Sequence, residues 1–109
     1  MAYDADLAAR IRQCLARRRG IAEKKMFGGI GFLWHGNMCV GIWKDALVAR
    51  VGPEAYETSL REPGVREFDI TGRAMQGWVL VGANAVETEA DVKAWVESCL
   101  NFVRTLPPK

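Results

Sequence analysis

The sequence predicts an α+β domain in which one antiparallel β-sheet of about five to six strands carries N- and C-terminal helices and a short middle helix. Helical periodicity is strongest at the two ends of the chain. Short apolar segments fill most of the stretch between them, and the turns that separate these segments are too short for helical crossovers. The chain has 109 residues, 50% of them hydrophobic, so we expect a single domain over residues 1–109.

The first element is expected to be an amphipathic helix from Asp4 to about Arg18. Asp4 or Asp6 suits its start and Gly20 suits its end, because acidic residues complement the helix dipole and glycine accepts the left-handed cap. Its apolar residues recur at steps of three and four positions, which places them on one face. They are Leu7, Ile11, Cys14 and Leu15.

Four strands with short connections are expected to follow as an antiparallel meander. They cover Glu23–Phe27, Ile30–Trp34, Met38–Trp43 and Ala46–Val51. Gly31 and Gly41 interrupt the second and third of these strands. Glycine inside a strand often marks a bulge or the close approach of another element.

The second half of the chain is predicted to contain a short helix, two strands and a long helix. The short helix runs from Pro53 to about Leu60, because proline is well placed at the first helical position. The strands cover Val65–Thr71 and Gly77–Val81. The last helix begins near Thr88, whose spacing to Asp91 fits a capping box. The helices should therefore cover one face of a single sheet.

The formal net charge is only +2, but it is unevenly distributed. Residues 1–25 hold seven Lys or Arg against three Asp or Glu, a net charge of +4, so the remainder of the chain carries −2. A basic first segment suits phosphates or an acidic partner. The alternative is that these charges simply solvate the end of a helix.

The residue pattern predicts no catalytic set, no metal site and no cofactor. Cys14, Cys39 and Cys99 are widely spaced, and His35, the only histidine, lies in a predicted turn. We therefore expect a protein that is not an enzyme. No apolar stretch approaches the ~18 residues of a membrane span, and the N-terminus lacks the pattern of a signal peptide. A cytoplasmic protein with no membrane partner is expected.

The glycine-rich stretch 27–31 raises the alternative of a phosphate-binding loop, because successive glycines expose backbone N–H groups. It lacks the Gly-Lys-Ser/Thr ending of a P-loop, and a strand rather than a helix is expected to follow it. A bulge or a sharp bend of the strand explains the glycines more simply.

Four basic residues form a candidate contact for an anion or a partner, provided that the first strand, the fourth strand and the loop over residues 72–76 are neighbours. They are Lys24, Lys25, Arg50 and Arg73. Consecutive residues of a strand point to opposite faces, so at most one of Lys24 and Lys25 shares this patch.

The tryptophans raise a further alternative, a stacking platform for single-stranded nucleic acid. Trp34 and Trp43 lie near the ends of adjacent predicted strands, Trp78 begins another strand, and Trp95 belongs to the apolar face of the last helix. Positions in the core explain most of them more simply, and the basic and aromatic pattern of an RNP motif is absent.

Five segments together resemble the TfoX N-terminal domain family across essentially the whole chain. They are Met1–Asp4, Glu23–Gly29, Arg50–Glu54, Thr71–Val79 and Arg104–Lys109. The resemblance implies an α+β domain similar to the secretion-chaperone-like fold. It also implies regulation, because longer TfoX/Sxy proteins carry a C-terminal helical domain and act as positive regulators of competence genes with a cAMP-receptor-type activator. We expect a stand-alone short form.

The positions that match the family's motifs lie in the strands and turns. They are Lys24, Lys25, Met26, Phe27, Gly28, Gly29, Arg50, Gly52, Pro53, Gly77 and Trp78. Relatives commonly have Pro and Lys where this chain has Ala74 and Gln76, so one positive charge is missing from the loop before Trp78. Several matching positions have structural explanations, such as glycine for backbone shape and proline for helix initiation.

The main functional prediction is a non-enzymatic regulatory or protein-interaction module, associated with transcription or competence, whose partner is an unidentified protein. Two alternatives stay open: a nucleic-acid-binding accessory module, and a small enzyme or methyltransferase-associated accessory protein. A homodimer is also open, because an antiparallel sheet with an uncovered edge can form a symmetric pair.

Overall fold

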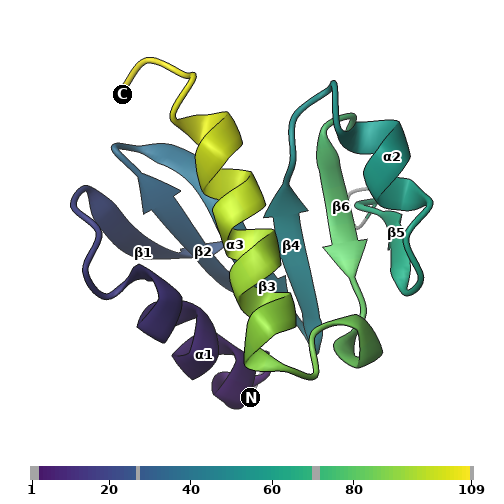
Figure 1. Ribbon diagram of the computed structural model, residues 1–109, viewed down its shortest axis with the longest axis horizontal. Coiled ribbons are helices and arrows are strands. Elements are labelled where there is room, and N and C mark those ends of the chain that lie inside the picture. The colour runs from purple at the N-terminus through teal and green to yellow at the C-terminus, as the bar shows by residue number, and fades with distance from the viewer. Residues whose placement is uncertain (1–2, 27, 70–71, 109) are drawn as a thin grey trace.

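The computed structural model describes residues 3–26, 28–69 and 72–108, and it has the predicted order of elements (Figure 1). The elements are α1 (Ala5–Leu15), β1 (Ile21–Met26), β2 (Gly29–Trp34), β3 (Asn37–Trp43), β4 (Ala46–Arg50), α2 (Tyr56–Leu60), β5 (Val65–Glu67), β6 (Trp78–Val81), the 3-10 turn η1 (Ala83–Ala85) and α3 (Glu89–Val103). The predicted α+β fold class, with one antiparallel sheet, two terminal helices and a short middle helix, is confirmed.

The described strands form one six-stranded sheet in the order β1-β2-β3-β4-β6-β5, and every neighbouring pair is antiparallel. The first four strands are the predicted meander. β6 then pairs with both β4 and β5, so the three-residue strand β5 lies at one edge and β1 at the other. α1 and α3 lie side by side on one face of the sheet (Figure 1).

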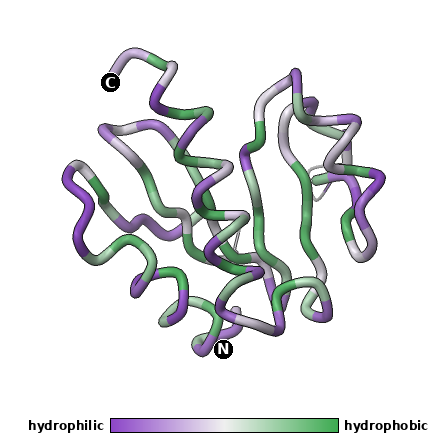
Figure 2. Tube along the Cα trace, in the orientation of Figure 1, coloured by the Kyte–Doolittle hydropathy of each residue, from purple (hydrophilic) through white to green (hydrophobic). Residues whose placement is uncertain are grey.

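The main core lies between these helices and the sheet. It contains Leu7, Ile11 and Leu15 of α1, and Val92, Val96, Cys99, Leu100 and Val103 of α3. Hydrophobic residues concentrate along β3, β4 and β6 (Figure 2). A second, smaller cluster lies on the opposite face of the sheet. It consists of Ala46, Val48, Phe68 and Leu80, with Met38, Trp43 and Trp78 packed against it. The central strands are therefore buried on both faces.

Side-chain caps set the starts of both long helices. Asp4 rather than Asp6 caps α1, because its Oδ1 accepts hydrogen bonds from the backbone N–H groups of Asp6 (2.9 Å) and Leu7 (3.1 Å). The predicted capping box of α3 is confirmed. Thr88 Oγ1 accepts from the N–H of Asp91 at 3.0 Å, and Asp91 Oδ2 accepts from the N–H of Thr88 at 3.4 Å.

Several predicted boundaries are wrong. α1 ends at Leu15 instead of Arg18, because the chain turns there and the N–H of Arg18 bonds the carbonyl of Leu15. The middle helix begins at Tyr56 instead of Pro53, since residues 53–55 form a turn. β5 ends at Glu67, where the chain leaves the sheet edge. β1 begins two residues early, at Ile21, and β4 ends at Arg50. The parts of these predictions that fall on Phe27, Ile70 and Thr71 lie outside the described residues.

The strand glycines serve close packing. Gly31 pairs with Gly41 across β2 and β3. A Cβ built on Gly31 would lie 2.5 Å from the Sδ of Met26 and 2.8 Å from the Sδ of Met38. The glycine thus leaves room for two methionine side chains on the face opposite the helices. The bulge in this strand pair falls between Phe32 and Leu33, one position beyond the glycine.

Candidate functional site

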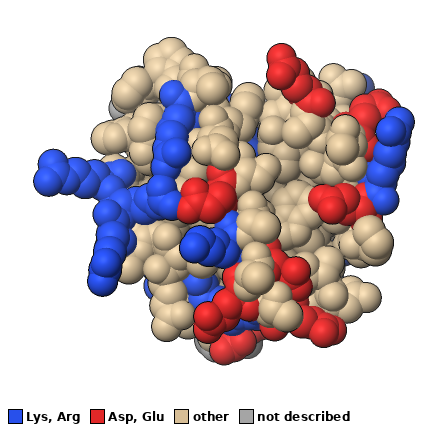
Figure 3. Space-filling view, in the orientation of Figure 1, with Lys and Arg blue, Asp and Glu red and all other residues tan. Residues whose placement is uncertain are grey.

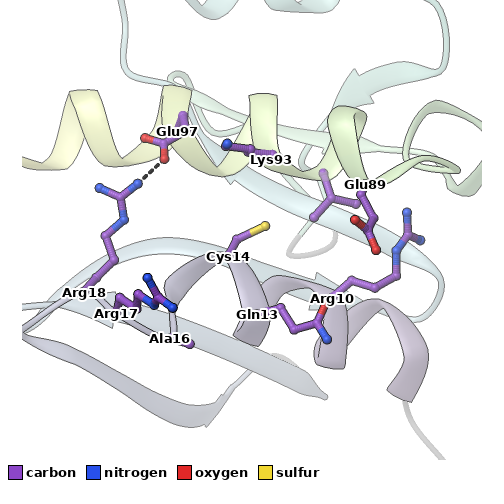
Figure 4. Close-up of a pocket in the computed structure, with 10 residues that line it drawn as sticks. Arg10, Gln13, Cys14, Ala16, Arg17, Arg18, Glu89, Lys93 and Glu97 are labelled. Carbon is purple, nitrogen blue, oxygen red and sulfur yellow. Dashed lines mark hydrogen bonds and ion pairs between the residues drawn. The ribbon is translucent and has the colours of Figure 1, made fainter.

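A groove of about 580 Å³ separates α1 and the turn after it from α3 (Figure 4). Its lining is mostly polar and carries four cationic and two anionic side chains. The lining residues are Arg10, Gln13, Cys14, Ala16, Arg17, Arg18, Glu89, Val92, Lys93 and Glu97. Its volume is typical of a small ligand or of a few residues of a bound segment.

Helical spacing explains why these side chains face each other. Arg10, Gln13 and Cys14 follow steps of three and four along α1, next to the buried stripe that faces the sheet. Glu89, Lys93 and Glu97 follow steps of four along α3. Both polar stripes line the groove between the two helices, so packing of the apolar faces against the main core also positions the charged residues.

The charges within the groove are only partly paired. Arg18 Nη2 donates to Glu97 Oε1 across the groove at one end (Figure 4). Arg10 and Glu89 lie at the other end, and Cys14 lies between the two ends (Figure 4). Arg10, Arg17 and Lys93 form no ion pair with any residue that the structure describes.

Arg10 has an unsatisfied hydrogen-bond donor. Its Nη2 atom is buried and has no acceptor among the described residues. A buried donor without a partner costs about 1–3 kcal/mol, and more when the group is charged. An oxygen acceptor, from water or from the carboxylate or phosphate of a ligand, would satisfy this donor.

The thiol of Cys14 is held protonated in this groove. Burial raises its pKa, and the carboxylates of Glu97 and Glu89 act in the same direction, whereas Lys93 and Arg10 act against them. Burial raises the pKa of Cys39 to about 12 and that of Cys99 well above its ordinary value. The thiolate is the reactive form of cysteine, so none of the three is an activated nucleophile.

Thiol labelling of the native protein at pH 7.5 is expected to modify Cys14 first and to leave Cys39 and Cys99 unmodified. Cys14 is half-buried whereas the other two are buried, and a raised pKa means that each thiol stays protonated below it. Mass spectrometry after a maleimide pulse measures the order, with the denatured protein as the control in which all three react. Equal labelling of Cys39 and Cys14 in the native state would contradict this burial.

The structure does not bring the predicted basic contacts together. Lys24 pairs with Gly31 and lies on the face opposite the helices, whereas Lys25 lies on the helix face. Arg50 lies in β4, three strand spacings or about 14 Å from β1. Arg73 is exposed in the loop before β6. Whether any of these residues binds an anion stays a prediction.

Arg50 has structural partners instead. Its Nη1 donates to the carbonyl oxygen of Met38 at 3.2 Å. Its guanidinium lies 5.0 Å from the ring of Trp78 and 5.6 Å from the ring of Phe102, which are cation–π distances. Burial lowers the pKa of Arg50. Arg50 thus ties the ends of β3, β4 and β6 to α3.

The family-motif positions form two joints at opposite ends of the sheet. At one end the carbonyl oxygen of Gly77 accepts from the N–H groups of Val51 (2.8 Å) and Gly52 (3.1 Å), next to Pro53. At the other end Met26 is the last residue of β1, Gly29 is the first residue of β2, and Gly28 lies in the turn between them. Phe27 belongs to the same motif and lies outside the described residues. None of these positions lines the groove.

The tryptophans do not form a single platform. Trp34 and Trp95 pack against the main core, and Trp43 and Trp78 pack against the second cluster on the opposite face. All four are half-buried. Trp78 also stacks on Phe68, with ring centroids 5.9 Å apart.

The described part of the chain contains no group of three or more His, Cys, Asp or Glu side chains that could hold a metal ion. None of its helices combines the length and apolar character that crossing a bilayer requires.

The fold and groove define a small α+β domain whose terminal helices share one face of a sheet and leave a charged cleft between them. Residues 13–103 match the model of the TfoX N-terminal domain, and the chain belongs to that family. The sequence resemblance is thereby confirmed. Comparisons with curated proteins and with solved structures found no match.

Sequence reasoning noted the basic first segment but missed the groove. The signal was present as two polar stripes at helical spacing, one in residues 10–17 and one in residues 89–97. Neither stripe by itself indicates that the two helices lie next to each other.

Proposed function

We propose that this chain is a non-enzymatic regulatory module that binds another protein, and that an acidic segment of the partner lies in the groove between α1 and α3. The regulatory role rests on membership of the TfoX N-terminal domain family. The single observation that carries the binding site is the buried Nη2 of Arg10, which has no acceptor among the described residues in a groove with two more unpaired cations, Arg17 and Lys93.

Carboxylates match what this groove lacks. An aspartate or glutamate of a partner accepts two parallel hydrogen bonds from a guanidinium, and such charge-assisted bonds are among the strongest in proteins. Lys and Arg side chains also gather on this face of the molecule where α1 ends and β1 begins (Figure 3). They would attract an acidic segment over a distance of roughly a Debye length, about 8 Å at physiological salt.

The acidic residues of the groove favour a protein over a nucleic acid. Glu89 and Glu97 line the groove among the cations, and acidic side chains gather near the start of α3 (Figure 3). A phosphate backbone carries one negative charge per nucleotide, so some phosphates would be repelled by these carboxylates however the strand is placed in the groove. A peptide can place its carboxylates at the cations and neutral or basic residues at Glu89 and Glu97.

Site-specific photo-crosslinking tests the proposal. A photoreactive amino acid replaces Gln13 in the lining, and the chain is expressed at its native level. The triple variant Arg10→Gln/Arg17→Gln/Lys93→Gln removes the unpaired cations. The matched control Arg61→Gln/Arg66→Gln/Arg104→Gln removes three exposed positive charges outside the groove.

We expect one protein to crosslink to the wild type and to the control. Its crosslinked yield should fall at least tenfold in the groove variant, which corresponds to a loss of about 1.4 kcal/mol of binding energy. Equal capture by the groove variant and the control would overturn the site. Crosslinked RNA or DNA in place of a protein would overturn the partner class, and binding that weakens steeply with salt would then be expected.

A further inference from the structure

We propose that Glu97 is an internal competitor, because its carboxylate competes with the acidic ligand for Arg18. The groove then has one open anion subsite at Arg10 and a second subsite at Arg18, which the chain's own carboxylate occupies. This inference rests on the proposed function, because it concerns how the same groove is regulated. The ligand class is a peptide with at least two carboxylates.

The contact that occupies the second subsite crosses the groove. Arg18 lies in the turn after α1 and Glu97 lies on α3, 79 positions later. Their side chains are 31% and 35% exposed, so solvent and a ligand can reach both groups. Glu97 therefore offers Arg18 the same carboxylate that an acidic segment would offer, from within the same molecule.

The open subsite differs in its hydrogen bonding. Arg10 lies at the opposite end of the groove from the Arg18–Glu97 pair, and its buried Nη2 has no acceptor that the structure describes (Figure 4). A first carboxylate of the ligand would bind there without displacing an ion pair. A second carboxylate reaches Arg18 only by displacing Glu97.

Lys93 gives the displaced carboxylate an alternative partner. It precedes Glu97 by four positions on α3, and residues at this spacing lie about 5–6 Å apart between their Cβ atoms. Lys93 has no ion pair among the described residues while Glu97 binds Arg18. Glu97 can thus exchange Arg18 for Lys93 by a rotamer change, which keeps its charge compensated when the ligand enters.

The exchange requires little energy because the pair is partly solvent-exposed. Such ion pairs contribute weakly to stability. Removing the carboxylate frees Arg18 and also removes a negative charge from the groove. Both effects strengthen binding of an acidic ligand, by about two- to fivefold if the gain equals the contribution of a partly exposed ion pair.

The experiment measures binding of a fluorescent hexaglutamate peptide by anisotropy at low salt and at 150 mM salt. We expect Glu97→Gln to bind the peptide about two- to fivefold more tightly than the wild type. Glu62→Gln, the same charge change at an exposed position outside the groove, should shift the affinity less than twofold. Thermal unfolding confirms that each variant is folded.

A double-variant cycle separates unmasking of Arg18 from a general charge effect. Arg18→Gln alone should weaken binding, because it removes the second subsite and leaves the Glu97 carboxylate in the groove. Adding Glu97→Gln to Arg18→Gln should then raise the affinity much less than Glu97→Gln does in the wild type. An equal gain with and without Arg18, or no gain in Glu97→Gln, overturns the internal competitor. The photo-crosslinking result does not depend on this cycle, so the two proposals fail separately.

Discussion

Replacing Gly29 with alanine is expected to destabilise the fold by about 3 kcal/mol or more, because the new methyl group meets backbone that cannot rotate away. A Cβ on Gly29 would overlap the carbonyl oxygen of Ile42 and lie 3.0 Å from its carbonyl carbon. Relief of this contact requires β2 and β3 to separate at their first paired residues. Urea denaturation followed by tryptophan fluorescence measures the loss.

The adjacent glycine provides a matched control. Gly28 has a φ of +78°, and no described atom lies within 4 Å of a Cβ built there. Gly28→Ala therefore carries only the cost of a left-handed conformation, about 1–2 kcal/mol. If Gly29→Ala lost no more stability than Gly28→Ala, the close approach to Ile42 would not be the reason for a glycine at this motif position.

Truncating Phe32 to alanine is expected to cost about 3–5 kcal/mol, the usual range for a large aromatic side chain in a core. Phe32 is only 1% exposed and is among the largest fully buried side chains. It belongs to the main core, between β1 and β3 in the sheet, so its loss leaves a cavity beneath the helices. The free energy of unfolding in urea measures the effect.

Phe32→Leu provides the comparison for this second prediction. Leucine keeps most of the apolar volume, so the expected loss is about 1–1.5 kcal/mol, well below that of alanine. Similar losses for the two variants would mean that the site collapses around the smaller side chain. In that case the main core is less tightly packed at β2 than the burial of Phe32 indicates.

The motif glycines of the family have a structural role in the fold, and other residues carry the proposed binding role. Gly29, Gly52 and Gly77 shape backbone joints at the two ends of the sheet. The groove is built from the terminal helices, and Arg10 precedes the residues that match the family model. Family membership alone therefore does not account for the open subsite, and ligand binding has to be tested on this chain.

The order of elements could be predicted from the sequence because it depends on local interactions. Apolar residues at steps of three and four formed α1 and α3, and the Thr88–Asp91 capping box began α3 where its spacing indicated. Short connections made the first four strands an antiparallel meander. The residues at which each helix or strand begins and ends were less predictable, because turns and strand pairing compete there with helix and strand propensity.

What the sequence by itself determined was thus the set of helices and strands, their order and their antiparallel character. The tertiary structure alone decided that Lys24 and Arg50 lie apart, that Arg50 packs against Trp78 and Phe102, and that a second cluster covers the far face of the sheet. It also placed Arg18 beside Glu97 and left Arg10 Nη2 without an acceptor among the described residues. These features join residues far apart in the chain, and local periodicity contains no information on which helix faces which.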